Sequence, residues 1–213
     1  IIRAHGAGGE PGADMHARIT TRILELRAME GADFAAGLNV LPDFHGNRSP
    51  LADPHARGVV SGLSLDASFD GLCRLYFRTA VAIALGVRHI REHLNANGHK
   101  VAALHVTGGH LRNPLLMELY ADATGCDVYE TGGEAMLLGT AMAAASAAGL
   151  YPDLPSACRA MRPDTTLLTA NPALADRYDN DYRIFLKMHE QRRALQDLAH
   201  HASFQTHKIA PVH

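Results

Sequence analysis

The sequence lacks the features that mark secreted, membrane-spanning and nucleic-acid-binding proteins. Only three cysteines occur, Cys73, Cys126 and Cys158, and they form no CxxC pair, which predicts reduced thiols in a cytosolic protein. No apolar run approaches the ~20 residues of a membrane-spanning helix, and no signal-peptide pattern is expected. The 20 basic and 22 acidic residues nearly balance and form no basic cluster. We therefore expect a cytoplasmic protein with no membrane partner and no nucleic-acid partner.

Metal-ligand patterns are also missing, although the chain contains 14 histidines. No compact quartet of cysteines and histidines has the spacing of a structural zinc site. His200, His201 and His207 lie near the C-terminal end, where residues 201–213 have the composition of a polar tail. Histidines in such a tail are expected to be solvated, so we expect no metal site.

What the sequence does contain is enough apolar material for a globular fold. Hydrophobic residues make up 47% of its 213 residues and the net charge is −2, values that exclude an intrinsically disordered chain. The first residue is Ile1 and not Met. We therefore expect a fragment of a longer product, folded as one large domain or two small ones.

Apolar periodicity predicts alternating strands and helices, the pattern of an α/β domain. The longest predicted helix carries an apolar stripe that we expect to be buried: Leu72, Tyr76, Ala80, Ile83, Val87, Ile90 and Leu94. Strands are predicted at 38–42, 58–65, 101–106 and 127–131, with an extended piece that ends at Leu168. Helices are predicted at 15–29, 69–96, 114–124, 134–148 and 155–161, with a long final helix after Pro172.

The segment from Thr107 to Pro114 is the most informative part of the chain. It follows an apolar, β-branched run and precedes an amphipathic segment, so we predict a strand, a glycine turn and a helix. The pair Gly108-Gly109 allows a sharp bend and a close approach of the main chain to a ligand. Asn113 followed by proline is typical of a helix start. Two interpretations remain open: a nucleotide site at the helix N-terminus, and a tight structural turn.

Three blocks in one order resemble the C-terminal half of FGGY-family carbohydrate kinases. The blocks are GNRSPLADPHARG at 46–58, TGGHLRNPLLMELYADATG at 107–125 and EAMLLGTAMAAASAAG at 134–149. Residues 41–45 and 182–187 are most similar to pentulose kinases of the ribulokinase type. The resemblance extends over most of the chain.

This resemblance implies an actin-like ATPase fold of the ribonuclease H-like class, with a mixed sheet and flanking helices. Such kinases have two actin-like domains with a cleft between them, and ATP lies mostly against the C-terminal domain. Residues 1–37 are then a partial lead-in of loop and helix, residues 38–200 the ATP-side domain, and residues 201–213 the tail. The implied reaction is phosphorylation of a pentulose similar to D-ribulose, with ATP and Mg²⁺.

The resemblance also implies nucleotide-binding residues. In relatives, the second glycine of the pair and the asparagine four residues later contact the nucleotide, which implies Gly109 and Asn113 here, with Gly108 shaping the turn. The alternative role of Asn113 is to cap the helix that follows. Arg48 is expected near the cleft between the domains, and its alternative role is to brace its loop by pairing with Asp53.

No residue of this chain matches the catalytic base of these kinases, which in relatives lies upstream of the region that matches Ile1. The sugar-binding residues and the phosphate-contacting loop of the N-terminal domain are expected there too. Because loss of a general base alone typically costs ~10²–10⁴ in rate, we expect the chain to be inactive without an N-terminal kinase domain.

The sheet is expected to be incomplete at its N-terminal edge, because fewer strands are predicted than an actin-like sheet contains. An unpaired edge favours self-association, so a homodimer is expected. Two alternatives to the kinase remain open: a non-catalytic nucleotide-binding or assembly domain, and an α/β domain whose glycine turn is merely structural.

Overall fold

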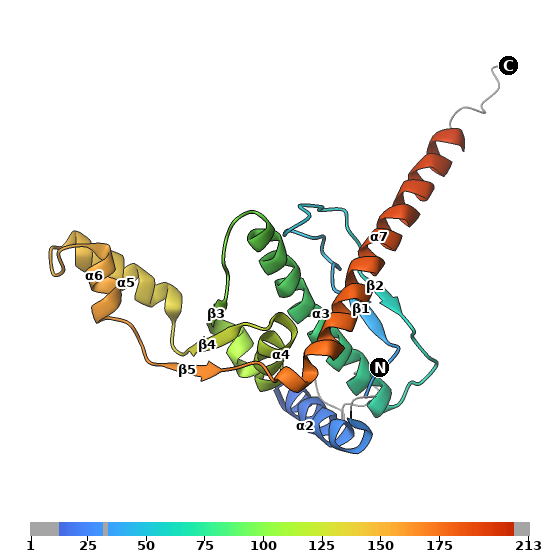
Figure 1. Cartoon of the computed structure of the whole chain (residues 1–213), viewed down its shortest axis with the longest axis horizontal. Helices are drawn as coiled ribbons and strands as arrows, with labels where there is room; N and C mark the ends of the chain where they lie inside the picture. Colours follow the sequence, from blue (N-terminus) through green and yellow to red (C-terminus); the bar gives the residue numbers. More distant parts are fainter. Residues whose placement is uncertain (1–12, 32–33, 207–213) are drawn as a thin grey trace. The chain divides into compact units, whose positions relative to one another are not determined.

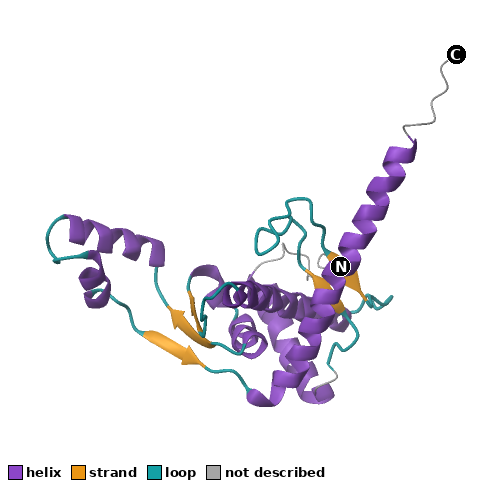
Figure 2. Cartoon of the chain, turned by 45° about the horizontal axis from the view of Figure 1, so that its top comes forward, coloured by secondary structure: helices purple, strands orange, loops and turns teal. Residues whose placement is uncertain are grey.

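The structure is a computed structural model that describes residues 13–31 and 34–206. Helices dominate it, and its strands form two separate small sheets (Figure 1; Figure 2). The contacts between residues divide the chain into two compact units. One consists of the residues up to Gly86 together with those from Arg177 onward, and the other is Val87–Asp176.

The first unit combines long helices with a two-stranded sheet. Its elements are α2 (Ala13–Glu30), β1 (Asn39–Leu41), β2 (Val59–Ser61), the first part of α3 (Phe69–Ala96) and nearly all of α7 (Ala175–Thr206). The two strands pair antiparallel, with Asn39 opposite Ser61. The apolar positions that predict α2, Ile19, Ile23 and Leu26, are all buried. This confirms the predicted amphipathic helix.

Helix α3 has the predicted bounds but buries a different face. Of the predicted stripe, Ala80 is buried, whereas Ile83 and Leu94 are 36% and 38% exposed. The other four residues, Leu72, Tyr76, Val87 and Ile90, are half-buried, so the predicted stripe is only partly buried. The buried face instead runs through Phe77, whose ring packs on that of Phe34 with 5.0 Å between centroids. Because α3 is apolar on more than one side, its tertiary neighbours select the face that is buried.

A buried ion pair connects α3, β1 and α7 within the first unit. Arg78 donates from its two terminal nitrogens to the carboxylate of Asp181, at 2.7 and 3.0 Å. The same guanidinium donates to the main-chain carbonyl of Leu38 at 2.6 Å and to Oδ1 of Asn39 at 2.7 Å. These hydrogen bonds offset the free-energy cost of removing both charges from water. Nothing would offset this desolvation cost for an unpaired buried charge.

The second unit is a three-stranded mixed sheet with flanking helices, in agreement with the predicted α/β class (Figure 2). Strands β3 and β4 are parallel, and β4 and β5 are antiparallel, in the order β3-β4-β5. After the end of α3 the elements are β3 (Ala103–Val106), η2 (Gly108–Arg112), α4 (Pro114–Thr124), β4 (Asp127–Thr131), α5 (Ala135–Ala147), α6 (Leu154–Ala160), β5 (Thr165–Leu168) and η3 (Pro172–Leu174).

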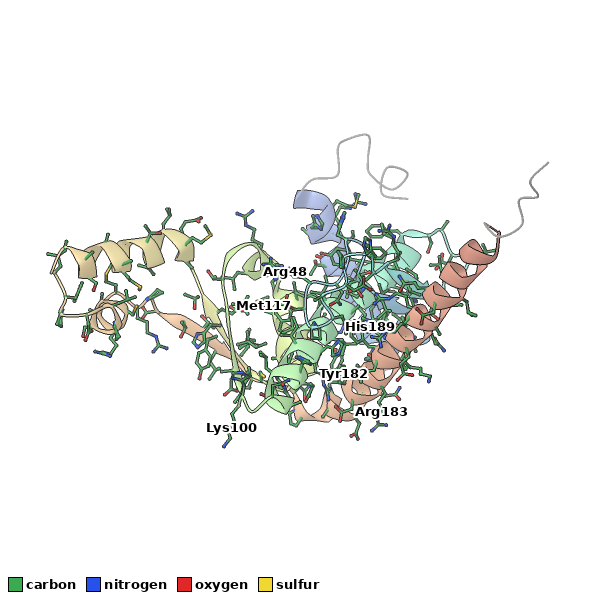
Figure 3. The ribbon with its side chains drawn as sticks, turned by 90° about the horizontal axis from the view of Figure 1, so that it is seen from above. Arg48, Lys100, Met117, Tyr182, Arg183 and His189 are labelled. Atoms are coloured by element: carbon green, nitrogen blue, oxygen red, sulfur yellow. The ribbon has the colours of Figure 1, made fainter. Side chains whose placement is uncertain are left out.

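Burial in the second unit is concentrated on α4. All its residues from Leu115 to Thr124 are buried except the half-buried Glu118, and Met117, which Figure 3 labels, is 1% exposed. In contrast, β3 and α5 contain no buried residue. We expect the alanines of α5 to allow close packing of another backbone, and α6 is the element that lies beside it (Figure 1).

The predicted element bounds agree with the structure best where the sequence signals are strongest. Helices α3 and α4 and strand β4 have the predicted bounds. Strand β2 is shorter than predicted, because only Val59–Ser61 pair with β1. Helix α7 continues to Thr206, so the first part of the expected tail is helical. Residues 1–12 and 207–213, including His207, lie outside the described residues.

The three cysteines are all free thiols, as predicted. Cys73 and Cys126 are buried, whereas Cys158 on α6 is exposed. Burial raises the pKa of the Cys73 thiol to about 11. The buried thiol at position 73 therefore stays protonated at neutral pH.

Candidate functional site

Gly108 is the second residue of the connection between β3 and α4. Its φ of +78° lies in the left-handed region, which glycine adopts without strain. The chain then forms a short 3-10 helix from Gly108 to Arg112, where the sequence predicts a glycine turn. A Cβ built on Gly108 or on Gly109 would meet no other atom within 4 Å. The main chain of the two glycines therefore borders open space that a ligand can enter.

Asn113 is the N-cap of α4. Its Oδ1 accepts a hydrogen bond from the main-chain N–H of Leu116 at 3.3 Å, and Pro114 follows at the first helical position. This confirms one of the two roles that the sequence leaves open. The other role, nucleotide contact, stays a prediction. The two roles are compatible, because the cap uses Oδ1 and an asparagine amide also carries two N–H donors on Nδ2.

A hollow of about 420 Å³ lies beside this connection in the second unit. Strand β3 and Val87 contribute most of the lining, together with the side chains of His110 and Tyr120. The Tyr120 hydroxyl lies 2.9 Å from Nδ1 of His110. Burial raises the pKa of Tyr120 to about 12. An apolar lining with a few polar groups is typical of small-molecule sites.

Arg48 belongs to the first unit, in the loop between β1 and β2. It is exposed and lines a hollow of about 320 Å³ with Asn47 and Pro54. Within the described part of the chain, no ion pair joins it to Asp53, whose Oδ1 instead accepts from the main-chain N–H of His55 at 2.9 Å. The structure thus does not form the bracing pair. The role of Arg48 near a nucleotide stays a prediction.

A buried charged cluster holds this loop to α7. The carboxylate of Asp43 pairs with Arg192 and lies 3.8 Å from Nδ1 of His189, and all three side chains are buried. Nδ2 of Asn47 donates to Oδ1 of Asp43 at 3.0 Å. Figure 3 labels His189, which lies on α7 among packed side chains. Sequence reasoning missed this cluster, because Arg192 lies 149 residues after Asp43 and no local pattern connects them.

Neither a metal cluster nor a membrane span is found in the described residues. They contain no group of three or more His, Cys, Asp or Glu side chains that could hold a metal ion. Such a group is not needed for Mg²⁺ in kinase sites, which one or two carboxylates hold together with substrate phosphates. Among the helices of the same residues, none has both the length and the apolarity needed to cross a bilayer.

Comparison with known proteins gives a consistent set of relatives. The family model for the C-terminal domain of the FGGY family of carbohydrate kinases matches residues 5–148. An FGGY carbohydrate kinase domain-containing protein of Xenopus laevis is 41% identical over 76% of this chain and 30% of its own length. A ribulokinase of Mycolicibacterium smegmatis is 38% identical over 72% of this chain and 27% of its own length.

A solved structure supports the same grouping. The xylulose kinase from Rhodospirillum rubrum is similar with a TM-score of 0.69 and 30% identity, over 87% of this chain and 36% of that one. This similarity confirms the predicted actin-like fold of sugar kinases. The chain spans about 30% of the length of the curated relatives that it matches first.

Proposed function

We propose a function for this chain from its family, because it belongs to the FGGY family of carbohydrate kinases. In this proposal the chain forms the nucleotide-binding side of an enzyme that transfers a phosphoryl group from ATP to a sugar. The observation that carries this proposal is the open main chain of Gly108 and Gly109 beside a hollow of about 420 Å³. Gly109 is the glycine that the resemblance assigns to nucleotide contact. Without a side chain at this position, the adenosine can approach the backbone directly.

The proposed sugar is a pentulose similar to D-ribulose. A relative at 38% identity is named a ribulokinase, and a solved relative at 30% identity is named a xylulose kinase, which is also named for a pentulose. In the reaction, Gly109 and Asn113 position the nucleotide, with Gly108 shaping the turn. Mg²⁺ accompanies the ATP phosphates. Phosphoryl transfer depends largely on such positioning and on charge stabilisation.

We further propose that residues 38–200 are the ATP-side domain of a cytoplasmic kinase, with residues 1–37 as lead-in and 201–213 as tail. In this proposal an N-terminal kinase domain supplies the catalytic base and the sugar contacts, and Arg48 lies near the cleft. The uncovered surface of the second unit supports a missing partner. Parallel strands are normally covered on both faces, yet β3 has no buried residue.

Nucleotide binding tests the proposal through a pair of matched caps. Asn113 and Asn171 each precede a proline and each cap a helix through Oδ1. Replacing either by alanine should lower the free energy of unfolding by about 1 kcal/mol. Only Asn113→Ala should also weaken ADP binding, by roughly 10-fold, the size of a lost hydrogen bond of about 1.4 kcal/mol. Titration calorimetry at equal folded fractions measures the ADP affinity of both variants. Equal affinities in the two variants would contradict the nucleotide role of Asn113.

Catalysis is tested by adding the part that the proposal requires. The chain alone should release no ADP from ATP in the presence of D-ribulose. It should gain activity when joined to the N-terminal region of the Xenopus laevis relative, which is 41% identical to it. The control joins the same region to the Asn113→Ala chain. A folded hybrid that binds ATP but phosphorylates no pentulose or polyol would favour the non-catalytic binding domain instead.

A further inference from the structure

An exposed histidine in the connection between β3 and α4 is fixed by a buried tyrosine. His110 lies in η2 between the two glycines and Asn113, and its side chain is exposed. Tyr120 lies on α4 and is 4% exposed. The hydroxyl of Tyr120 and Nδ1 of His110 are 2.9 Å apart, with the rings tilted by 37°. An exposed side chain that is anchored from the core has a defined orientation before any ligand arrives.

The hydrogen bond also determines which nitrogen of the imidazole carries the proton. A buried phenol with a pKa of about 12 keeps its proton at neutral pH. Within the described residues, its hydroxyl has no other hydrogen-bond partner than Nδ1 of His110. Donation from this hydroxyl to Nδ1 of the neutral ring gives the hydroxyl proton an acceptor and leaves the ring proton on Nε2, whereas the opposite direction would leave the hydroxyl proton without an acceptor among the described residues. If the ring is protonated, Nε2 still carries a hydrogen. Nε2 of His110 is thus a donor in either state.

We propose that His110, positioned by Tyr120, donates a hydrogen bond from Nε2 to an acceptor atom of the bound adenine nucleotide. This inference rests on the proposed function of the same connection. Both side chains line the hollow of about 420 Å³ beside the glycine pair. The acceptor is a ring nitrogen, a ribose oxygen or a phosphate oxygen, which accept from N–H groups through a lone pair. Tyr120 acts as a positioning residue, since its hydroxyl is hydrogen-bonded to the histidine.

The expected effects on ADP affinity follow from the two roles. His110→Ala should weaken binding by roughly 3–10-fold, the range of one neutral hydrogen bond. Tyr120→Phe should weaken it by about 2–3-fold, and the double variant should resemble His110→Ala alone, because the two side chains act as one unit. The matched controls, His99→Ala and Tyr151→Phe, change an exposed histidine and a half-buried tyrosine of the same unit and should have no effect.

A spectroscopic measurement separates positioning from a structural role. Long-range ¹H–¹⁵N spectra of the chain without nucleotide should show His110 as the Nε2–H form, and Tyr120→Phe should convert it to a mixture of both forms. Titrations with adenosine, AMP and ADP then locate the acceptor. A loss in His110→Ala that is already present with adenosine places it on the nucleoside, and a loss confined to ADP places it on the phosphates.

The outcomes distinguish this inference from the proposed function. If ADP affinity depends on Asn113 but is unchanged in His110→Ala, the inference is overturned and the nucleotide site stands. An Nδ1–H form in the wild-type chain also overturns it. If the wild-type chain binds no adenine nucleotide, both the inference and the proposed site are overturned.

Discussion

Arg78 and Asp43 are buried charged residues whose partners lie far along the chain. Arg78 pairs with Asp181, and Asp43 pairs with Arg192. Both partners lie on α7, so this helix receives one buried contact from α3 and one from the loop between β1 and β2. A buried charge that loses its partner pays the cost of desolvation without compensation. These pairs therefore make the folding of the first unit depend on single side chains.

Removal of one partner should be far more costly here than at an exposed pair. Arg78→Met leaves the Asp181 carboxylate buried and unpaired, and we expect a loss of about 3–5 kcal/mol in the free energy of unfolding. The comparison is Lys187→Met, which breaks an exposed pair with Glu190 on the same helix and should cost less than about 1 kcal/mol. Urea denaturation followed by circular dichroism measures both. Similar losses of unfolding free energy in the two variants would contradict the larger contribution expected of the buried Arg78 pair.

At the scale of elements, the sequence predicts where a helix begins and ends better than it predicts which neighbours the helix packs against. The bounds of α4 follow from local signals, namely the Asn113-Pro114 start and Gly125, which adopts a left-handed φ of +67° at the end. The buried face of α3 cannot be predicted in the same way, because it depends on which neighbour the helix meets. The hydrogen bond between His110 and Tyr120 escapes prediction for a similar reason, since it requires the connection to close back on α4.

The contact between α2 and α3 should make stability depend on acid pH. Arg22 donates to both carboxylate oxygens of Asp70, at 2.8 and 2.9 Å, and this lowers the pKa of Asp70. A lowered pKa in the folded state adds stability above the unfolded pKa of about 3.9, and this contribution is lost as pH falls through the folded pKa. Asp70→Asn should therefore be less stable than wild type at pH 6, and the difference should shrink below about pH 4.

The control for this pH dependence is Asp164→Asn, which changes an exposed carboxylate that has no ion pair within the described residues. Its stability difference from wild type should stay small at both pH values. Thermal unfolding at several pH values measures the effect. A difference between wild type and Asp70→Asn that grows as the pH falls would have the wrong sign and would contradict the role of the Arg22 contact.

At the scale of the whole molecule, an uncovered apolar surface lies on α5 of the second unit. Met136 and Leu137 on α5 are 88% and 69% exposed, and no residue of α5 is buried. Strand β3 is an edge of its sheet, and sheet edges offer unpaired N–H and C=O groups to other chains. The sequence block at 134–149, which contains α5, helped to predict the family. The exposure of the apolar side chains on α5 could not be predicted from the sequence, because it depends on which elements cover the helix. Exposed apolar groups of this size favour association.

We expect the chain alone to self-associate as its concentration rises. Sedimentation velocity should show an increasing average mass, and Met136→Glu with Leu137→Lys should reduce it, because charge on α5 opposes apolar contact. The matched control is Met29→Glu, which changes a methionine on α2 that is 65% exposed in the first unit. A chain that remains monomeric at all concentrations would contradict the proposed homodimer. Equal association of the α5 variant and the control would exclude α5 as its surface.

The single exposed cysteine offers a chemical reporter for the same surface. Cys158 belongs to α6, the neighbour of α5, whereas the other two sulfhydryls are shielded inside the fold. A maleimide fluorophore should consequently attach at one place without any engineering of the chain. Its rate of attachment would then fall whenever another polypeptide covers this helical hairpin, so one kinetic trace could follow that association.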